Sequence, residues 1–430
     1  MRLSVAVIGG GAAGLAAAVA AAERGCAVTV YEASDRVGRS ILATGNGRCN
    51  FSNALLDVSA YHNSAFASDV FQSLARAADA VGLPSGDAVG LSSDDAVGLP
   101  SDELRTNAQN DAVLSFFRRH GLCWDEEAEG RLYPTSRKAS TVLDVLRFSG
   151  QAAGVEVCCN TRIASIEPPR AADKPFTLRT SDGVFKRADA VIVAVGGTVA
   201  RTLLPDDVPF VEQRGVLGPL ATNTELVRQL DNTRVRCEVV LRDPCGAEKA
   251  RECGEVLFRK YGVSGIAIFN LSRFAQPGDT LQLSFVPHGV EKRSVVTKLE
   301  ARFDILSSVY APLTAESFLR GMFAGMVGEV LCKYAGISFE SPLTRAQLAD
   351  LAQAITAFTL KVQGLGDASR CQVHRGGVAV GAVDSRTMEL QSCPGLYVVG
   401  EALDVDGPCG GYNLHWAWAS GLLAALSLAQ

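Results

Sequence analysis

Three glycines near the N-terminus have the spacing of a dinucleotide-binding loop. Gly9, Gly11 and Gly14 form the pattern G-x-G-x-x-G directly after an apolar run that predicts a buried strand over residues 3–8. In such a loop the first glycine permits a tight turn and the second lets a pyrophosphate approach closely. The third lets the following helix pack on the strand. The predicted chemistry is the binding of phosphates at the start of a helix.

Glu32 extends this pattern to the sugar of the nucleotide. It ends the apolar run AVTVYE, 18 residues beyond Gly14, where a carboxylate can accept a hydrogen bond from a ribose hydroxyl. An acid at this position favours a ribose with a free 2′-hydroxyl, which FAD and NAD have and NADP lacks. The alternative is a glycine-rich turn that binds no ligand.

A second cluster of acids and glycines, near the C-terminus, favours FAD over NAD. The apolar run GLYVVGEALD contains Gly400, Glu401 and Asp404, and the tetrapeptide GGYN at residues 410–413 then opens a helix. An acid there can accept hydrogen bonds from the ribityl hydroxyls of a flavin. A helix N-terminus can stabilise the negative charge that reduction places on the O2/N1 edge of the isoalloxazine. The alternative is an edge strand and a helix that merely complete the sheet.

Three further segments could border the cofactor. The stretch LATGNGRCNFSN, residues 42–53, shows neither strand nor helix periodicity and predicts an irregular loop that needs a reason to hold one shape. Residues 188–197, ADAVIVAVGG, predict a buried strand that ends in glycines beside the cofactor. Residues 154–167, GVEVCCNTRIASIE, predict a strand pair whose backbone near Ile163 could meet the adenine. The last two segments are also compatible with ordinary sheet.

Composition limits the class of protein. The 430 residues are 47% hydrophobic with a mean hydropathy of +0.15, which allows two or three domains or subdomains. A net charge of −5 without a block of like charges predicts no nucleic-acid partner and no membrane surface. The twelve cysteines are scattered without zinc-type spacing, which predicts reduced thiols, a cytoplasmic location and no metal site. The uncharged N-terminal run is interrupted by glycines and predicts no membrane span.

Five blocks give the sequence a family resemblance. They are the N-terminal glycine pattern, GRSILATGNGRCNFSN, GRLYPTSRKASTVLDVL, GEVLFRKYGVSGIAIFNLSR, and the long block from VHRGGVAVGAVD to GGYNLHWAWASG. With these blocks the chain resembles the BaiN-like flavoproteins, also known as aminoacetone-oxidase-type FAD-binding proteins. Two departures stand out: Ser40 replaces a usual lysine, and the segment after Gly197 is shorter than usual in the family.

The resemblance implies the fold class and its boundaries. The expected fold is α/β, a Rossmann-like FAD-binding domain of the glutathione-reductase type with an inserted β-barrel-like domain and a small helical insert. Alternating apolar runs over residues 198–287 favour strands, and the pattern over 291–356 favours helices. The expected divisions are 1–197 and 371–430 for the FAD domain, 198–290 and 357–370 for the barrel, and 291–356 for the helices.

The resemblance also places the irregular loop along the FAD. Its glycines permit close contact, Arg48 can neutralise phosphate or flavin charge, Asn46 and Asn50 offer amide hydrogen bonds, and Cys49 is expected to pack rather than react. The expected cofactor-binding residues are Gly9, Gly11, Ala12, Ala13, Gly14, Glu32, Ala33, Gly38, Arg39, Thr44, Asn46, Gly47, Arg48, Cys49, Asn50, Ile163, Ala194, Gly196, Gly400, Glu401, Asp404, Gly411, Tyr412, Asn413 and Leu414.

The expected activity is an FAD-dependent reduction of a C=C bond conjugated to a ketone, on an enone or bile-acid-like small molecule. Alternatives are an amine or ketone oxidase and a flavin-binding redox sensor without turnover. No second dinucleotide loop is visible, so NADH or NADPH is expected to dock transiently as electron donor. The expected catalytic residues are Tyr412, His415 and Tyr261, with His374 and Arg375 as further candidates. The sequence does not indicate the oligomeric state.

Two observations stay outside this scheme. His62, His120 and His288 show no partner spacing. Residues 79–102 contain an octapeptide in three tandem copies, DAVGLPSG, DAVGLSSD and DAVGLPSD. Because glycine, proline, serine and aspartate dominate the repeat, we interpret it as a duplication within a surface loop; a binding arm is the alternative.

Overall fold

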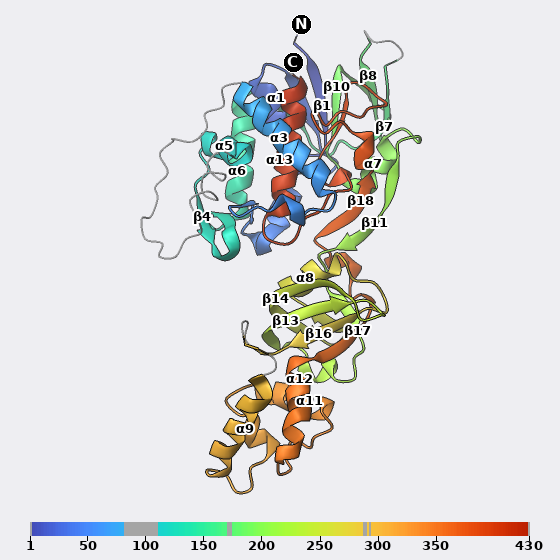
Figure 1. The fold of residues 1–430 in the computed structure, drawn as a ribbon. Helices are drawn as coiled ribbons and strands as arrows, with labels where there is room; N and C mark the ends of the chain where they lie inside the picture. Colours follow the sequence, from blue (N-terminus) through green and yellow to red (C-terminus); the bar gives the residue numbers. More distant parts are fainter. Residues whose placement is uncertain (1, 81–110, 170–173, 287–289, 292–293, 429–430) are drawn as a thin grey trace. The chain divides into compact units, whose positions relative to one another are not determined.

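The computed structural model describes residues 2–80, 111–169, 174–286, 290–291 and 294–428 (Figure 1). His288 and nearly all of the octapeptide repeat lie outside these residues. The chain divides into two compact units, the first comprising Met1–Arg214 with Val373–Gln430 and the second Gly215–Gln372. Each unit has its own cluster of buried hydrophobic side chains.

A five-stranded parallel sheet forms the centre of the first unit. Its order is β19 (Leu396–Val398), β10 (Ala190–Val193), β1 (Ser4–Ile8), β2 (Ala27–Tyr31) and β6 (Glu156–Cys158). The strands β1, β10 and β19 are short, almost entirely buried runs of mostly apolar residues, as expected for strands covered on both faces, whereas the edge strand β6 is largely exposed. Because all five are parallel, their carboxyl ends lie along one edge of the sheet, where ligands bind in open α/β folds.

Two buried helices pack together beside this sheet, α1 (Ala12–Glu23) and α13 (Tyr412–Leu428). Both are apolar around most of their circumference, which is typical of helices inside a core. Their backbones approach closely, since a Cβ on Gly421 would lie 2.4 Å from the carbonyl oxygen of Ala13. Further helices of this unit are α2 (Arg39–Ala43), α3 (Ser64–Ala80), α5 (Ala112–Arg119), α6 (Ala139–Ala152) and α7 (Gly197–Leu203).

Smaller sheets complete the first unit. One contains β3 (Ser52–Asn53), β5 (Arg131–Pro134) and β4 (Trp124–Glu127), and another contains β7 (Ile163–Glu167), β8 (Phe176–Thr180) and β9 (Phe185–Ala188). The strand pair predicted over 154–167 was wrong in one respect, because β6 and β7 belong to different sheets. The reason is a turn at Asn160, where φ is 53° and the chain leaves the parallel sheet.

The second unit contains a closed barrel and a group of helices that share one hydrophobic core. The barrel order is β12 (Leu220–Thr222), β15 (Gly262–Ser264), β14 (Glu248–Arg259), β13 (Arg234–Arg242), β16 (Thr280–Ser284) and β17 (Phe358–Leu365). The helices are α8 (Ile266–Ser272), α9 (Ser294–Ser307), α10 (Ala315–Leu319), α11 (Gly325–Tyr334) and α12 (Leu348–Thr356). The predicted fold class, with a barrel and helices inserted in a Rossmann-like domain, is confirmed.

Two strands carry the chain between the units, β11 (Phe210–Val216) and β18 (Val373–Val378), which pair as a two-stranded sheet. The units divide at 214/215 and 372/373, whereas the sequence placed the divisions at 197/198 and 370/371. The first difference arises because α7 follows β10 directly and packs on β18 and β7 within the first unit.

Candidate cofactor-binding and catalytic site

The glycine loop connects β1 to α1 at the carboxyl edge of the parallel sheet. Gly9 has φ +105°, and a Cβ there would lie 2.5 Å from the carbonyl oxygen of Ala194. A Cβ on Gly14 would lie 2.0 Å from the carbonyl oxygen of Gly9, so helix and strand could not pack as they do. Gly11 differs, because among the described residues only Oγ of Ser40 would lie within 4 Å of a Cβ there, at 3.4 Å. The space in front of Gly11 is therefore nearly open.

The N-terminus of α1 faces this space with amides that have no hydrogen-bond partner among the described residues. The first helical hydrogen bond runs from the Leu15 amide to the Gly11 carbonyl at 3.0 Å, so the amides of Ala12, Ala13 and Gly14 precede it. Gly11 is the N-cap and supplies no side-chain hydrogen bond. Free amides and the positive end of a helix dipole beside open space suit a pyrophosphate.

Glu32 lies beside the same loop, at the end of β2. Its Oε2 accepts from the Gly10 amide at 2.8 Å and its Oε1 accepts from the Ser34 amide at 2.7 Å. These bonds fix the carboxylate next to the exposed Ala33, and each oxygen retains a lone pair for a ribose hydroxyl. The chain that leads to Ile163, which is buried in β7, contacts this strand end through the Thr161 amide and the Glu32 carbonyl, 2.9 Å apart.

The loop after α2 has an unusual backbone. Gly45, Asn46, Gly47 and Cys49 have φ of 56°, 54°, 81° and 58°, so the permissive glycines and an asparagine stand where left-handed backbone requires them. The prediction of irregular structure over 42–53 needs correction at both ends. Leu42 and Ala43 finish α2, and residues 52–53 form β3, because β5 offers a strand edge for pairing.

The side chains of this loop differ in whether they are free to bind a ligand. Oδ1 of Asn50 is buried and has no hydrogen-bond partner among the residues that the structure describes. Arg48 lies over the Tyr133 ring at 4.5 Å and 3.4 Å from Glu127. Cys49 is fully buried, and burial raises its pKa to about 12, as expected for a thiol that packs rather than reacts. A buried amide oxygen without a donor fits a loop that borders a hydrogen-bonding ligand.

The remaining predicted cofactor residues flank these elements. Gly38 is the N-cap of α2 with φ +75°, and Arg39 follows with a largely exposed side chain. Thr44 donates to the Ile41 carbonyl at 2.6 Å and closes the end of α2. Ala194 follows β10 and donates to the Ile8 carbonyl, and Gly196 is the N-cap of α7.

Hydrogen bonds join the loop to the turn that precedes α13. Asn53 donates from Nδ2 to the Gly410 carbonyl at 2.9 Å, and Trp418 donates from Nε1 to the Phe51 carbonyl at 2.9 Å. Gly411 has φ +98°, and a Cβ there would lie 2.2 Å from the Ser52 carbonyl oxygen. Two motifs far apart in the sequence therefore form one continuous wall.

Asn413 and Leu414 lie in the first turn of α13, which begins at Tyr412. The amide of Asn413 closes the turn before the helix, because its Oδ1 accepts from the Gly407 amide and its Nδ2 donates to the Gly407 carbonyl, both at 2.9 Å. Its side chain is thus committed to the backbone of this turn.

The two C-terminal acids have different environments. Asp404 is 6% exposed and accepts from the Gly376 amide at 2.8 Å and from Nε2 of His62 at 3.3 Å. Burial raises the pKa of Asp404, but its hydrogen bonds from His62, Gly376 and Asn63 outweigh burial and lower it. Glu401, in the short helix η8 (Gly400–Ala402) directly after β19, has a half-exposed side chain that accepts from His374. Glu401 is therefore the more accessible acid for a ribityl chain.

The candidate proton donors also differ in exposure. His415 is 3% exposed, with Nδ1 2.8 Å from Ser52 Oγ and Nε2 3.5 Å from Asp111; burial lowers its pKa. Tyr412 is nearly buried, and its hydroxyl accepts from the Asp57 amide at 3.2 Å. Both side chains are thus engaged in packing the site wall. Tyr261 lies in the second unit, between β14 and β15, with its ring against Gly366.

His374 and Arg375 are adjacent on β18 but make different contacts. Nδ1 of His374 lies 3.0 Å from Oε1 of Glu401, and the side chain is 45% exposed. Arg375 binds the buried Asp406 with two hydrogen bonds, at 2.5 and 3.0 Å. The sequence did not reveal these pairs, nor His62 with Asp404 and His120 with Glu23, since the partners are far apart in the chain.

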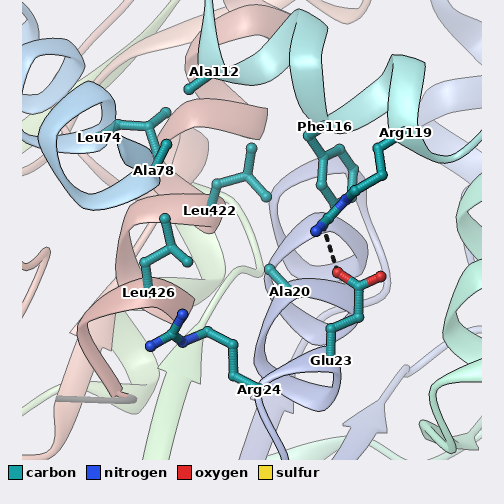
Figure 2. Close-up of a pocket in the computed structure, with 10 residues that line it drawn as sticks. All are labelled: Ala20, Glu23, Arg24, Leu74, Ala78, Ala112, Phe116, Arg119, Leu422 and Leu426. Atoms are coloured by element: carbon teal, nitrogen blue, oxygen red, sulfur yellow. Dashed lines mark hydrogen bonds and ion pairs between the residues drawn. The ribbon is translucent and has the colours of Figure 1, made fainter. Parts of the chain in front are cut away.

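A cavity of about 190 Å³ lies at the C-terminal end of α1 (Figure 2). The glycine loop is at the N-terminal end of this helix, so the cavity is not part of the phosphate site. Its lining residues are mostly apolar, and an ion pair between Arg119 and Glu23, 2.6 Å apart, borders it. The lining residues are Ala20, Glu23, Arg24, Leu74, Ala78, Ala112, Phe116, Arg119, Leu422 and Leu426.

Within the described part of the chain, no group of three or more histidine, cysteine, aspartate or glutamate side chains could hold a metal ion. The described helices include none that is long and apolar enough to cross a membrane.

The observations at the carboxyl edge of the sheet fit FAD. They are the open space at Gly11, the uncapped α1, the carboxylates of Glu32 and Glu401, and the unpartnered Asn50 oxygen. Fold and site together define the class of protein, an FAD-dependent oxidoreductase with a Rossmann-type FAD-binding domain.

More particularly, the chain belongs to the HI0933-like family. The family model described as the HI0933-like protein Rossmann domain matches residues 3–78 and 103–427. This finding, with the relatives that follow, confirms the family resemblance predicted from the motifs.

Three relatives align over 99% of this chain. A 3-dehydro-bile acid Δ(4,6)-reductase of Clostridium scindens is 30% identical over 99% of its own length. Two proteins named ribosomal RNA dihydrouridine synthase, from Haemophilus influenzae and Escherichia coli, are 25% and 26% identical, each over 98% of its length.

Among solved structures, a 3-ketosteroid-Δ4-(5α)-dehydrogenase of Rhodococcus jostii RHA1 aligns with all of this chain and 97% of its own. The TM-score is 0.47 at 14% identity, a likeness too slight to support a conclusion.

Proposed function

We propose that the protein reduces a C=C bond conjugated to a carbonyl group in a small molecule, with NADH or NADPH as the electron donor. The observation that carries the substrate class is the full-length similarity, at 30% identity, to a reductase that acts on a 3-dehydro-bile acid. FAD, when bound, supplies the hydride for this reaction.

The order of polar groups along the sheet edge supports the position of the cofactor. Glu32 follows β2, the free amides of α1 follow β1, and Glu401 follows β19, which is the far strand on that side. In this assignment Glu32 accepts from the adenosine ribose, the amides of Ala12 and Ala13 bind the pyrophosphate, and Glu401 accepts from the ribityl chain. The N-terminus of α13 would stabilise negative charge on the isoalloxazine ring.

A second candidate substrate is uridine within ribosomal RNA, which two full-length relatives favour by name. The chemistry is of the same kind, because dihydrouridine is uridine whose C5=C6 bond, conjugated to a carbonyl, has been reduced. The net charge of −5 favours the small molecule. The absence of a nucleic-acid partner therefore stays a prediction.

Anaerobic half-reactions test this proposal. The purified protein is reduced with NADH or NADPH and then mixed with a conjugated steroid enone, a saturated ketone control, an amine, or uridine-containing RNA. We expect a nicotinamide to reduce the flavin and the enone to reoxidise it. Reduction of the flavin by the amine instead would indicate an oxidase, and reoxidation by RNA alone would favour the second substrate.

A further inference from the structure

One histidine–carboxylate pair lies at the flavin end of the predicted cofactor path. Glu401 follows β19 at the carboxyl edge of the sheet, and His374 lies on β18, which packs against η8. Oε1 of Glu401 accepts from the His374 amide at 2.9 Å and lies 3.0 Å from Nδ1 of His374. One carboxylate oxygen thus fixes both the backbone and the ring of this histidine.

The same contacts leave one atom of each side chain available. Within the described residues, neither Nε2 of His374 nor Oε2 of Glu401 makes a hydrogen bond, and the side chains are 45% and 41% exposed. His415 and His120 differ, since both ring nitrogens of each have partners and both side chains are nearly buried. A ring held through Nδ1 with Nε2 accessible is the arrangement that a general acid needs.

The surroundings of His374 favour its protonated form. The hydrogen bond that His374 donates to Glu401 raises the pKa of His374, burial lowers it, and the negative charge of Glu401 raises it further. On the elements packed against β18, the other charged side chains are Arg201 on α7, Glu212 and Arg214 on β11, and Asp404 just beyond η8. None of these four side chains is a cause of the raised pKa of His374.

Resting on the proposed function, we propose that His374, positioned by Glu401, donates the proton that completes reduction of the substrate. The β carbon of the conjugated C=C bond accepts a hydride, which brings two electrons. The bond between Nε2 and its proton in His374 breaks, and the α carbon takes that proton. The product is the saturated ketone, and neutral His374 regains a proton from water. Oε2 of Glu401 remains free for a ribityl hydroxyl.

Three variants test this role: His374→Gln, Glu401→Gln and, as a matched control, His120→Gln. His120 is also paired with a glutamate, at 2.9 Å from Glu23, but at the far end of α1. In anaerobic rapid mixing, His374→Gln should slow reoxidation of the reduced flavin by an enone about 100-fold or more. Reduction by NAD(P)H should stay at the wild-type rate, and His120→Gln should match the wild type in both half-reactions.

The pH dependence distinguishes a proton donor from a merely structural residue. The wild-type reoxidation rate should fall as pH rises through the pKa of His374, and His374→Gln should lose that inflection. Glu401→Gln should move it to lower pH. In the protein without flavin, NMR titration of the His374 ring should give a pKa above its usual 6.5, lower in Glu401→Gln.

Two results would overturn the proposal: an unchanged rate and inflection in His374→Gln, or a His374 ring that titrates at or below 6.5 in the wild type. The NMR result does not depend on how well a variant folds. Failure of the proposed function is distinguishable, because then no enone reoxidises even the wild-type protein.

Discussion

The hydroxyl of Ser52 lies 2.8 Å from Nδ1 of His415, although 363 residues separate them in the chain. Asn53 donates a hydrogen bond to the Gly410 carbonyl in the turn before α13, and the Phe51 carbonyl accepts one from Trp418 in α13 itself. The glycine–asparagine loop and the C-terminal helix are therefore one structural wall, and the burial of His415 in that wall has consequences for stability.

Acid should destabilise the protein through His415. Burial lowers the pKa of His415 below its usual 6.5, and Asp111 only partly opposes this. The unfolded chain therefore binds the extra proton first, so stability is full above about pH 6.5 and falls as pH decreases toward the folded pKa. His415→Asn should reduce this loss in the free energy of unfolding by up to about 1.4 kcal/mol per pH unit. Urea unfolding between neutral pH and pH 5 measures this; equal pH slopes in both proteins would contradict it.

Substitutions in the glycine loop should separate folding from cofactor binding. Gly11→Ala adds a methyl group that meets only Ser40, so its Tm without flavin should match the wild type while FAD binds at least about tenfold more weakly. Gly14→Ala forces a contact 2.0 Å from the Gly9 carbonyl oxygen and should lower the Tm itself. Calorimetry and FAD titration measure both quantities. Full FAD affinity in Gly11→Ala would place the pyrophosphate elsewhere.

Removing the Glu32 carboxylate should weaken FAD binding. Glu32→Ala loses a charge-assisted hydrogen bond worth about 1.5–3 kcal/mol, so the Kd should rise roughly tenfold to a hundredfold. Because Glu32 also accepts from the Gly10 and Ser34 amides, some stability should be lost as well. Glu32→Gln keeps a hydrogen-bond acceptor, so its FAD affinity should lie between those of the wild type and Glu32→Ala. FAD affinity equal to that of the wild type would mean that the acid does not contact the ribose.

Charge at the start of α13 should change the flavin potential. Asn413→Asp adds a negative charge there and should lower the two-electron potential by roughly 20–40 mV. Asn413→Ser is the control, because it too loses the hydrogen bond that Nδ2 donates to the Gly407 carbonyl but adds no charge. Dye-linked spectroscopic titration at full FAD occupancy compares them. An equal or higher potential in the aspartate variant would show that this helix does not face the flavin.

The sequence predicted the elements whose patterns are local. Gly9, Gly11 and Gly14 with the alanine-rich helix predicted the strand, turn and helix that the structure contains, since each depends on neighbours within one turn. The sequence did not predict which polar side chains already have hydrogen-bond partners within the protein. Asn413 binds Gly407, Asp404 binds His62, and Glu401 holds His374, because tertiary packing brings these partners together without any periodic signal. Burial also distinguishes Tyr412 and His415 from the half-exposed His374, which sequence alone could not do.

A single turnover with a conjugated enone tests whether the protein reduces the C=C bond of such a substrate. The flavoprotein is reduced chemically under anaerobic conditions, so that no nicotinamide is needed, and is mixed with one equivalent of a 3-keto-4-ene bile acid. We expect the flavin to return to its oxidised spectrum while the substrate gains two hydrogens across its C=C bond, and the saturated ketone control to leave the flavin reduced. A flavin that stays reduced with the enone, or an oxidised flavin with unchanged substrate, would contradict the proposed reaction.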